Sequence, residues 1–116
     1  DCLLSRGLGD VYKRQAYNGG NDMITINAIM KVDAAQRNNY LALIEPLKRA
    51  SNQEAGALYY EHFENTDEPN TFAFIERYKD EQALEAHNQS EHFQQFFSEV
   101  KQYLVEEPEI KVLSSN

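Results

Sequence analysis

Two of the three histidines in the chain lie five positions apart, in the stretch LEAHNQSEHF at residues 84–93. Histidine is the side chain that most readily exchanges a proton near neutral pH. Apolar spacing places His87 toward the buried face of a helix expected over residues 80–89. Ser90 is a typical N-cap, so His92 is expected in the first turn of the next helix, where the helix dipole favours neutral, proton-accepting imidazole. The two histidines are therefore either proton carriers beside a pocket or packing residues at a helix junction.

The elements that must position these histidines follow from hydrophobic periodicity. Alternating apolar residues predict strands, and apolar residues three and four positions apart predict helices. The expected strands cover residues 24–32, 57–64, 71–78 and 108–113. The expected helices cover residues 33–53, 80–89 and 91–104. This order predicts a ferredoxin-like α+β sandwich of βαββαβ type, with a four-stranded antiparallel sheet covered by helices on one side.

Single residues mark the ends of the first helix. Asp33 is expected to cap its start. Pro46 removes one helical hydrogen bond and predicts a kink. Gly56 is expected in a loop or as the residue that terminates the helix.

Apolar and aromatic residues occupy both faces of the expected hairpin. One face carries Leu58, Tyr60, His62, Phe72, Phe74 and Tyr78, and the other carries Tyr59, Phe63, Ala73 and Ile75. Helices cover only one of these faces, so the other needs a different cover. A second copy of the chain would supply it, which predicts a homodimer closed face to face, with His62 lining the barrel or at its rim.

Composition restricts the possible partners. The chain has 116 residues, which suggests one domain, and a formal net charge of −8. An acidic surface repels a phosphate backbone, so we expect no nucleic-acid partner. No run approaches the roughly 18 apolar residues of a membrane span, so no membrane partner is expected. Cys2 is the one cysteine; it excludes an intrachain disulfide and a cysteine-rich zinc site, and a cytoplasmic protein is expected.

Residues 1–22 differ from the rest of the chain. They show no sustained period and end in a Gly-Gly cluster. We interpret them as a disordered or non-native leader, with Met23 as the natural start of a domain spanning residues 23–116.

The order and spacing of several motifs resemble the antibiotic-biosynthesis monooxygenase domain over roughly residues 24–113. The matching positions are Glu54, Gly56 and Tyr60, then Glu76 and Tyr78, then Leu84, His87, His92 and Phe93. The resemblance implies a dimeric α/β barrel with one pocket per subunit. It also implies one of several activities: cofactor-free oxygenation of hydroquinones or polycyclic phenols, haem degradation, or processing of a phosphorylated quorum-sensing signal.

Oxygenation without a cofactor sets its own chemical requirements. The protein must deprotonate an electron-rich substrate, keep it from water and stabilise the anion that then reduces O2. The expected catalytic residues are His87, His92 and Tyr60. The expected substrate-binding residues are Asn27, Glu76, Tyr78 and Phe74. A small aromatic substrate and O2 are the expected partners, and no cofactor or metal is expected.

Each candidate has a structural alternative. The alternative for the histidines and tyrosines is packing in a core, that for Glu76 is a structural hydrogen bond, and that for Asn27 is a solvent-facing position. Haem degradation is disfavoured, because the chain has no Trp and Phe97 falls near the position of the iron-binding histidine. The remaining alternatives are an isomerase or degrader of a phosphorylated signal, which would need several basic residues, and a dimeric module that binds an aromatic ligand without turning it over. Only Lys31, Arg77 and Lys79 lie near the strands to serve the first of these.

Overall fold

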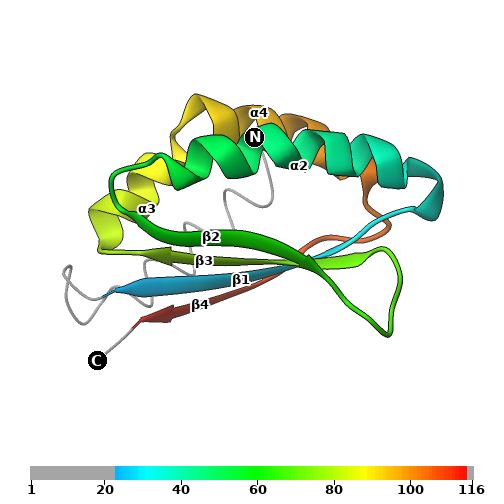
Figure 1. Ribbon diagram of the computed structural model, residues 1–116, viewed down its shortest axis with the longest axis horizontal. Helices are drawn as coiled ribbons and strands as arrows, with labels where there is room; N and C mark the ends of the chain where they lie inside the picture. Colours follow the sequence, from blue (N-terminus) through cyan, green and yellow to red (C-terminus); the bar gives the residue numbers. More distant parts are fainter. Residues whose placement is uncertain (1–22, 115–116) are drawn as a thin grey trace.

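A computed structural model describes residues 23–114 of the chain. The interpretation of residues 1–22 as a leader lies outside the described residues. Four strands form one antiparallel sheet in the order β2-β3-β1-β4, as Figure 1 shows. The strands are β1 (Ile24–Lys31), β2 (Ala57–Glu64), β3 (Thr71–Tyr78) and β4 (Glu109–Ser114). This topology confirms the expected ferredoxin-like α+β fold.

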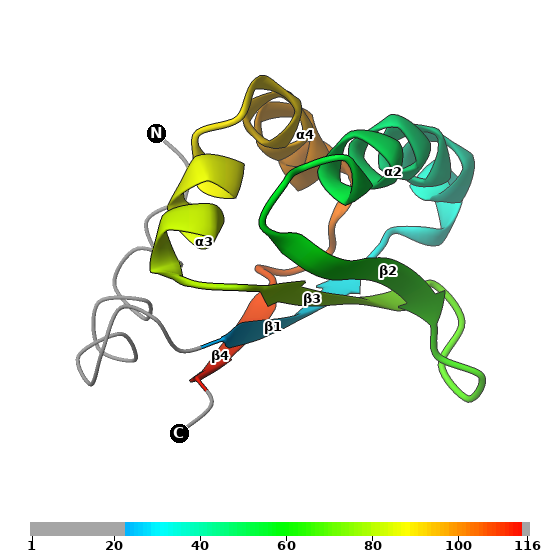
Figure 2. The ribbon, with the colours of Figure 1, turned by 60° about the vertical axis from the view of Figure 1, so that its left-hand side comes forward.

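The helices lie on one side of the sheet (Figure 2). They are the 3-10 turn η2 (Ala34–Gln36), α2 (Arg37–Asn52), α3 (Glu81–Asn88), α4 (Glu91–Val100) and the 3-10 turn η3 (Lys101–Tyr103). Within residues 23–114, none of the helices has the length and apolar character needed to cross a membrane.

Caps set the helix boundaries. The carboxylate of Asp33 accepts from the backbone N–H of Ala35, but it caps η2, so α2 begins later than expected. Pro46 lies on the exposed side of α2, and the helix continues through it. Ser90 caps α4 by accepting from the N–H of Phe93, as its position in the sequence predicts.

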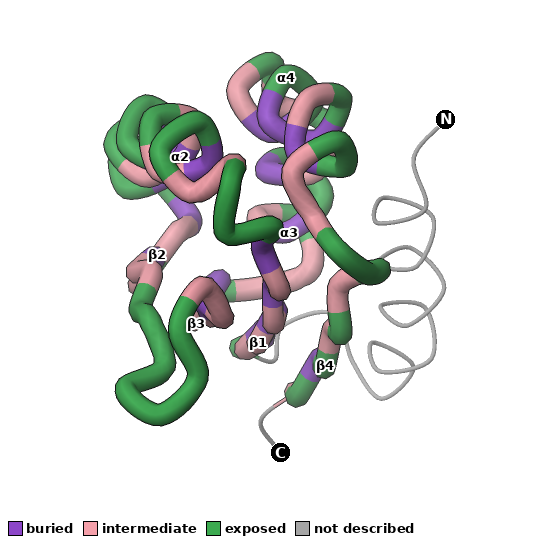
Figure 3. Tube along the Cα trace, turned by 90° about the vertical axis from the view of Figure 1, so that its right-hand side faces the viewer, coloured by how far each residue is buried: buried purple, intermediate pink, exposed green. Residues whose placement is uncertain are grey.

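The core lies between the sheet and the helices, as the burial pattern in Figure 3 shows. The inward face of β1 buries its alternate residues, and the outward residues are only partly buried. Helix α4 adds a stripe of large side chains over the sheet, at the spacing that the sequence indicates. The buried residues of these two elements are Ile24, Ile26, Ala28, Met30, Phe93, Phe96, Phe97 and Val100.

One position of β2 departs from simple alternation. The pairing with β3 shifts register between Ala57 and Tyr59, which leaves Leu58 as the extra residue of a β-bulge. Leu58 is consequently 56% exposed, whereas Tyr60 is buried. The expectation that Leu58 and Tyr60 share one face is therefore wrong.

The outward face of the sheet remains partly apolar. Phe63 and Leu113 are exposed there, and Tyr59, Ala73 and Ile75 are half-buried. This is the face that the sequence assigns to a second copy. The homodimer itself stays a prediction.

Candidate functional site

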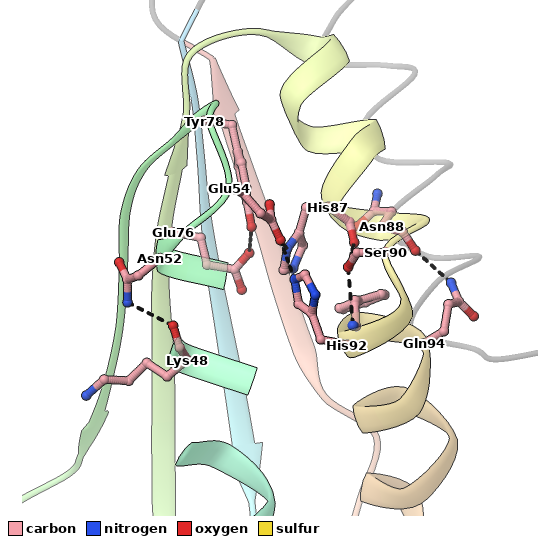
Figure 4. Close-up of polar contacts among 11 residues, drawn as sticks. Lys48, Asn52, Glu54, Glu76, Tyr78, His87, Asn88, Ser90, His92 and Gln94 are labelled. Atoms are coloured by element: carbon pink, nitrogen blue, oxygen red, sulfur yellow. Dashed lines mark hydrogen bonds and ion pairs between the residues drawn. The ribbon is translucent and has the colours of Figure 1, made fainter. Parts of the chain in front are cut away.

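A single carboxylate joins the two histidines of the LEAHNQSEHF stretch. Oε2 of Glu54 lies 2.8 Å from Nδ1 of His87 and 2.5 Å from Nε2 of His92. Glu54 belongs to the turn after α2, His87 to the last turn of α3 and His92 to the first turn of α4 (Figure 4). Three elements thus bring their polar side chains to one point, which we call the Glu54 cluster.

Close backbone packing makes this convergence possible. A Cβ atom on Gly56 would lie 2.3 Å from Cβ of Ala83 on α3, so only glycine lets the turn after α2 approach this helix. The carbonyl of Gly56 also accepts from the N–H of Lys79, just before α3. Asp80 caps α3 by accepting from the N–H of Ala83. The turn that carries Glu54 is therefore held directly against the helix that carries His87.

The two histidines differ in their surroundings. The side chain of His87 is 1% exposed and that of His92 is 26% exposed, with Glu54 between them at 17%. The ring of His87 packs against the rings of Tyr60, Tyr78 and Phe93, at centroid distances of 5.3, 5.3 and 5.0 Å. The cluster therefore runs from solvent into an aromatic interior.

The hydrogen bonds assign the tautomer of His87. A carboxylate accepts only, so Nδ1 of His87 carries the proton and donates it to Glu54. In the neutral ring, Nε2 of His87 is then the unprotonated nitrogen. It is buried and has no hydrogen-bond partner among residues 23–114. A buried nitrogen lone pair without a hydrogen-bond partner can accept a proton from a molecule bound next to it.

The surroundings shift the pKa values of the other ionisable groups of the site in different directions. Partial burial raises the pKa of Glu54, but hydrogen bonds from His87 and His92, together with the positive charge of these rings when they are protonated, outweigh burial and leave its pKa below the ordinary value. Burial raises the pKa of Glu76, against the opposing effects of His87 and of the Tyr78 hydroxyl that donates to it at 2.7 Å. Burial also raises the pKa of Tyr60 well above its usual range. Glu54 is the anionic group, and Glu76 and Tyr60 are biased toward the neutral, hydrogen-bond-donating forms.

Two spaces lie near the cluster: Tyr60 and Phe93, which pack against His87, line the first, and His92 itself lines the second. An interior cavity of about 10 Å³, the room of one water molecule, is lined by Ile26, Ala28, Met30, Tyr60, Phe74, Glu76, Phe93, Phe96 and Ile110. A groove of about 110 Å³ between α2 and α4 is lined by Leu43, Pro46, Leu47, His92, Gln95 and Phe96. Phe96 belongs to both, so its ring separates the groove from the cavity.

The structure brings most of the expected site residues together. His87 and His92 meet at Glu54, Tyr78 bonds Glu76, and Tyr60, Phe74 and Glu76 line the cavity. Asn27 is the exception, because it lies on the outward face of β1, paired with Ile75 and Lys111.

His62 also lies outside the cluster. Its Nε2 is 2.8 Å from the hydroxyl of Tyr40, and its ring stacks on Phe72. Glu54 is the residue that the sequence reasoning missed. The sequence signal for its role was a Glu-x-Gly motif in a chain that also carries a His-x4-His motif.

Comparison with known proteins identifies the family. The family model described as Antibiotic biosynthesis monooxygenase matches residues 23–99. The chain belongs to the antibiotic biosynthesis monooxygenase family. It is similar to "Putative monooxygenase YcnE" of Bacillus subtilis (strain 168), with 38% identity over 82 residues that cover 71% of this chain and 86% of the relative.

Solved structures share the fold of this antibiotic biosynthesis monooxygenase domain. A conserved protein from Methanosarcina mazei Go1 has a TM-score of 0.79 at 24% identity, over 86% of this chain and 99% of that one. Rv0793 from Mycobacterium tuberculosis has a TM-score of 0.77 at 22% identity, over 81% of this chain and 95% of that one. The family supports a function of monooxygenase type, and the residues of the Glu54 cluster suggest how it is carried out.

Proposed function

We propose that this protein is a cofactor-independent monooxygenase that oxidises a hydroquinone or polycyclic phenol with O2. The observation that carries the proposal is the buried imidazole of His87, which donates through Nδ1 to Glu54 and leaves Nε2 without a partner among the described residues. O2 reacts slowly with neutral closed-shell molecules and faster with a phenolate, so a base beside an aromatic interior supplies what the reaction lacks.

The first step is removal of the phenolic proton. Nε2 of His87 takes the proton, and Glu54 stabilises the resulting imidazolium. His92 shares Oε2 of Glu54 and is partly exposed, so it provides a path for the proton to solvent. Tyr60 and Glu76 line the cavity and donate hydrogen bonds to the substrate oxygen.

The substrate anion, and not a group of the protein, then reacts with O2. The phenolate gives an electron to O2, and the resulting radical pair combines to form a carbon–oxygen bond. Loss of water leaves a quinone, so that one oxygen atom of O2 enters the product and the other leaves as water with two hydrogens from the substrate. The protein contributes a dry, aromatic enclosure and the proton acceptor.

Access to this enclosure requires a side-chain movement. The interior cavity is the size of one water molecule, so an aromatic ring fits only after its walls move. Rotation of Phe96 would join the cavity to the groove between α2 and α4, because its ring lines both. We infer that substrate enters past Phe96 and beside His92.

The apolar outward face supports a homodimer closed sheet to sheet. Exposed Phe63 and Leu113 would be covered by the second copy, and the sheet that carries the site would be stiffened.

Oxygen uptake by chelator-treated protein, measured against a panel of hydroquinones and anthrones, tests the function. We expect uptake by the wild type, a loss on the order of 100-fold or more in His87→Ala, and a smaller loss in His92→Ala. His62→Ala is the matched control, because this third histidine lies outside the Glu54 cluster. Wild-type rates in both His87→Ala and His92→Ala would contradict the assignment of the base. Binding of these compounds without oxygen uptake would favour the binding-module alternative.

The phosphorylated-signal alternative has less support. Lys31 and Arg77 lie on the outward face of the sheet, where Lys31 pairs with Glu106 and Arg77 stacks over Tyr59. These two cations lie away from the Glu54 cluster. The third, Lys79, packs its side chain near Gly56 in the turn that carries Glu54, and one cation is fewer than the several that an anion site would need.

A further inference from the structure

The Glu54 cluster also has the composition of a metal site. The donor atoms of Glu54, His87 and His92 all lie within 4.8 Å of one another. Two imidazoles and one carboxylate are a ligand set for divalent transition metals such as Zn²⁺, Co²⁺ and Fe²⁺. Mg²⁺ and Ca²⁺ prefer oxygen ligands and would gain little from two imidazoles.

The distances require only a small opening of the cluster. Ligand atoms about 2.1 Å from a metal ion lie about 3.0–3.4 Å apart. Oε2 of Glu54 is 2.8 Å from Nδ1 of His87 and 2.5 Å from Nε2 of His92. His92 is the side chain that can move, since it is partly exposed beside the groove, and water from the groove can complete the coordination.

One buried polar atom points to a ligand at this place. Oε1 of Glu54 is buried without a hydrogen-bond partner among the described residues, and a metal ion bound by both carboxylate oxygens would satisfy it. Nε2 of His87 faces away from this position and is free to carry the ring proton when a metal ion occupies Nδ1. Histidines that bind metals usually carry a proton on the other ring nitrogen, directed toward an acceptor.

We propose that Glu54, His87 and His92 bind one divalent transition-metal ion per chain, and that the bound ion switches the oxygenase site off. The second half rests on the proposed function. An ion on Nδ1 of His87 obliges the single proton of the neutral ring to move to Nε2, where the substrate proton would otherwise be accepted. The ring keeps one proton throughout, so metal binding changes its tautomer and removes the base. The metal-free base and the metal site are two states of the same three side chains.

Metal titration without substrate tests the site. Chelator-treated protein is titrated with Co²⁺ and Zn²⁺ by calorimetry, and the visible absorption of Co²⁺ reports its ligands. We expect one ion per chain for the wild type and for the control His62→Ala, and no binding of Mg²⁺. Glu54→Gln and His92→Ala should weaken binding at least about tenfold. His92→Ala alters a partly exposed side chain, so a folded variant is available for the comparison.

Two results would overturn the metal site: a wild type that binds neither Co²⁺ nor Zn²⁺, or an equal loss of affinity in His62→Ala and His92→Ala. Oxygen uptake then tests the switch, which requires that Zn²⁺ abolish uptake and that a chelator restore it. Uptake unchanged at saturating Zn²⁺ would refute the switch. If the metal-free wild type consumes no oxygen, the proposed function and the switch fail together, while the titration still decides the metal site.

Discussion

Oε2 of Glu54 lies 2.8 Å from Nδ1 of His87, across 33 positions of the sequence. The contact joins the turn after α2 to the last turn of α3 and fixes which nitrogen of the buried ring carries the proton. Glu54 contacts Nδ1 of His87, not Nε2, the nitrogen proposed to take the substrate proton. It therefore acts on the reaction through His87, as a positioning residue.

Replacing Glu54 by Gln should lower kcat about 10- to 100-fold and change KM much less. Glutamine keeps the size of the side chain but loses the negative charge that stabilises the imidazolium of His87. Steady-state oxygen uptake over a range of substrate concentrations separates the two constants. Glu85→Gln, an exposed position on α3, is the control for charge. An unchanged kcat in Glu54→Gln would show that the contact is only structural.

Replacing Gly56 by Ala should destabilise the fold by about 1–3 kcal/mol. The added Cβ would lie 2.3 Å from Cβ of Ala83, so α3 must move away from the turn that carries Glu54. Urea unfolding measures the change. The double variant Gly56→Ala/Ala83→Gly removes the clashing atom and should recover part of the loss. A double variant no more stable than Gly56→Ala would mean that the contact with Ala83 is not the cause.

His62 should make the protein less stable in acid. Burial lowers the pKa of His62 from 6.5 to about 4, helped by Lys48 and opposed by Glu64. Between these two pH values the unfolded chain binds a proton that the folded chain does not, so the free energy of unfolding falls as pH falls. The loss from pH 7 to pH 4 should be about 2–3 kcal/mol larger in the wild type than in His62→Gln. Urea unfolding at both pH values checks this; equal losses in the two proteins would contradict it.

The outward face of the sheet should hold two copies together. Ile75 lies on this face at the centre of β3, opposite Asn27 and Glu61 on the neighbouring strands. Ile75→Lys would place two lysines in the interface and should convert a dimer into a folded monomer, measured by light scattering after gel filtration. Gln82→Lys adds the same charge on an exposed position of α3 and should leave the dimer intact. A wild type that is already monomeric would contradict the proposed homodimer.

Local rules account for most of the fold. Alternation predicts the buried face of β1, and the Ser90 cap predicts where α4 begins. The bulge at Leu58 was not predictable, because it depends on how β2 pairs with a strand that follows it in the chain. Asn27 was predicted to bind substrate because its amide can donate a hydrogen bond. Strand alternation instead places it on the face of the sheet away from the helices.

The Glu54 cluster could be predicted only in part. Sequence spacing placed His87 and His92 at a helix junction, but it gave Glu54 no role. The convergence depends on tertiary packing: the turn after α2 meets α3 because Gly56 has no side chain. No local pattern reports a contact between residues 33 and 38 positions apart.

The tautomer of His87 is the most direct test of the central claim. Long-range ¹H–¹⁵N correlation spectra of metal-free, ¹⁵N-histidine-labelled protein at neutral pH distinguish protonated from unprotonated ring nitrogens. His87→Gln identifies the signals of His87 by their absence. We expect a protonated Nδ1 and an unprotonated Nε2 for His87, and loss of this fixed pattern in Glu54→Gln. A proton on Nε2 in the metal-free wild type would contradict the account, because the ring would then have no lone pair for the substrate proton.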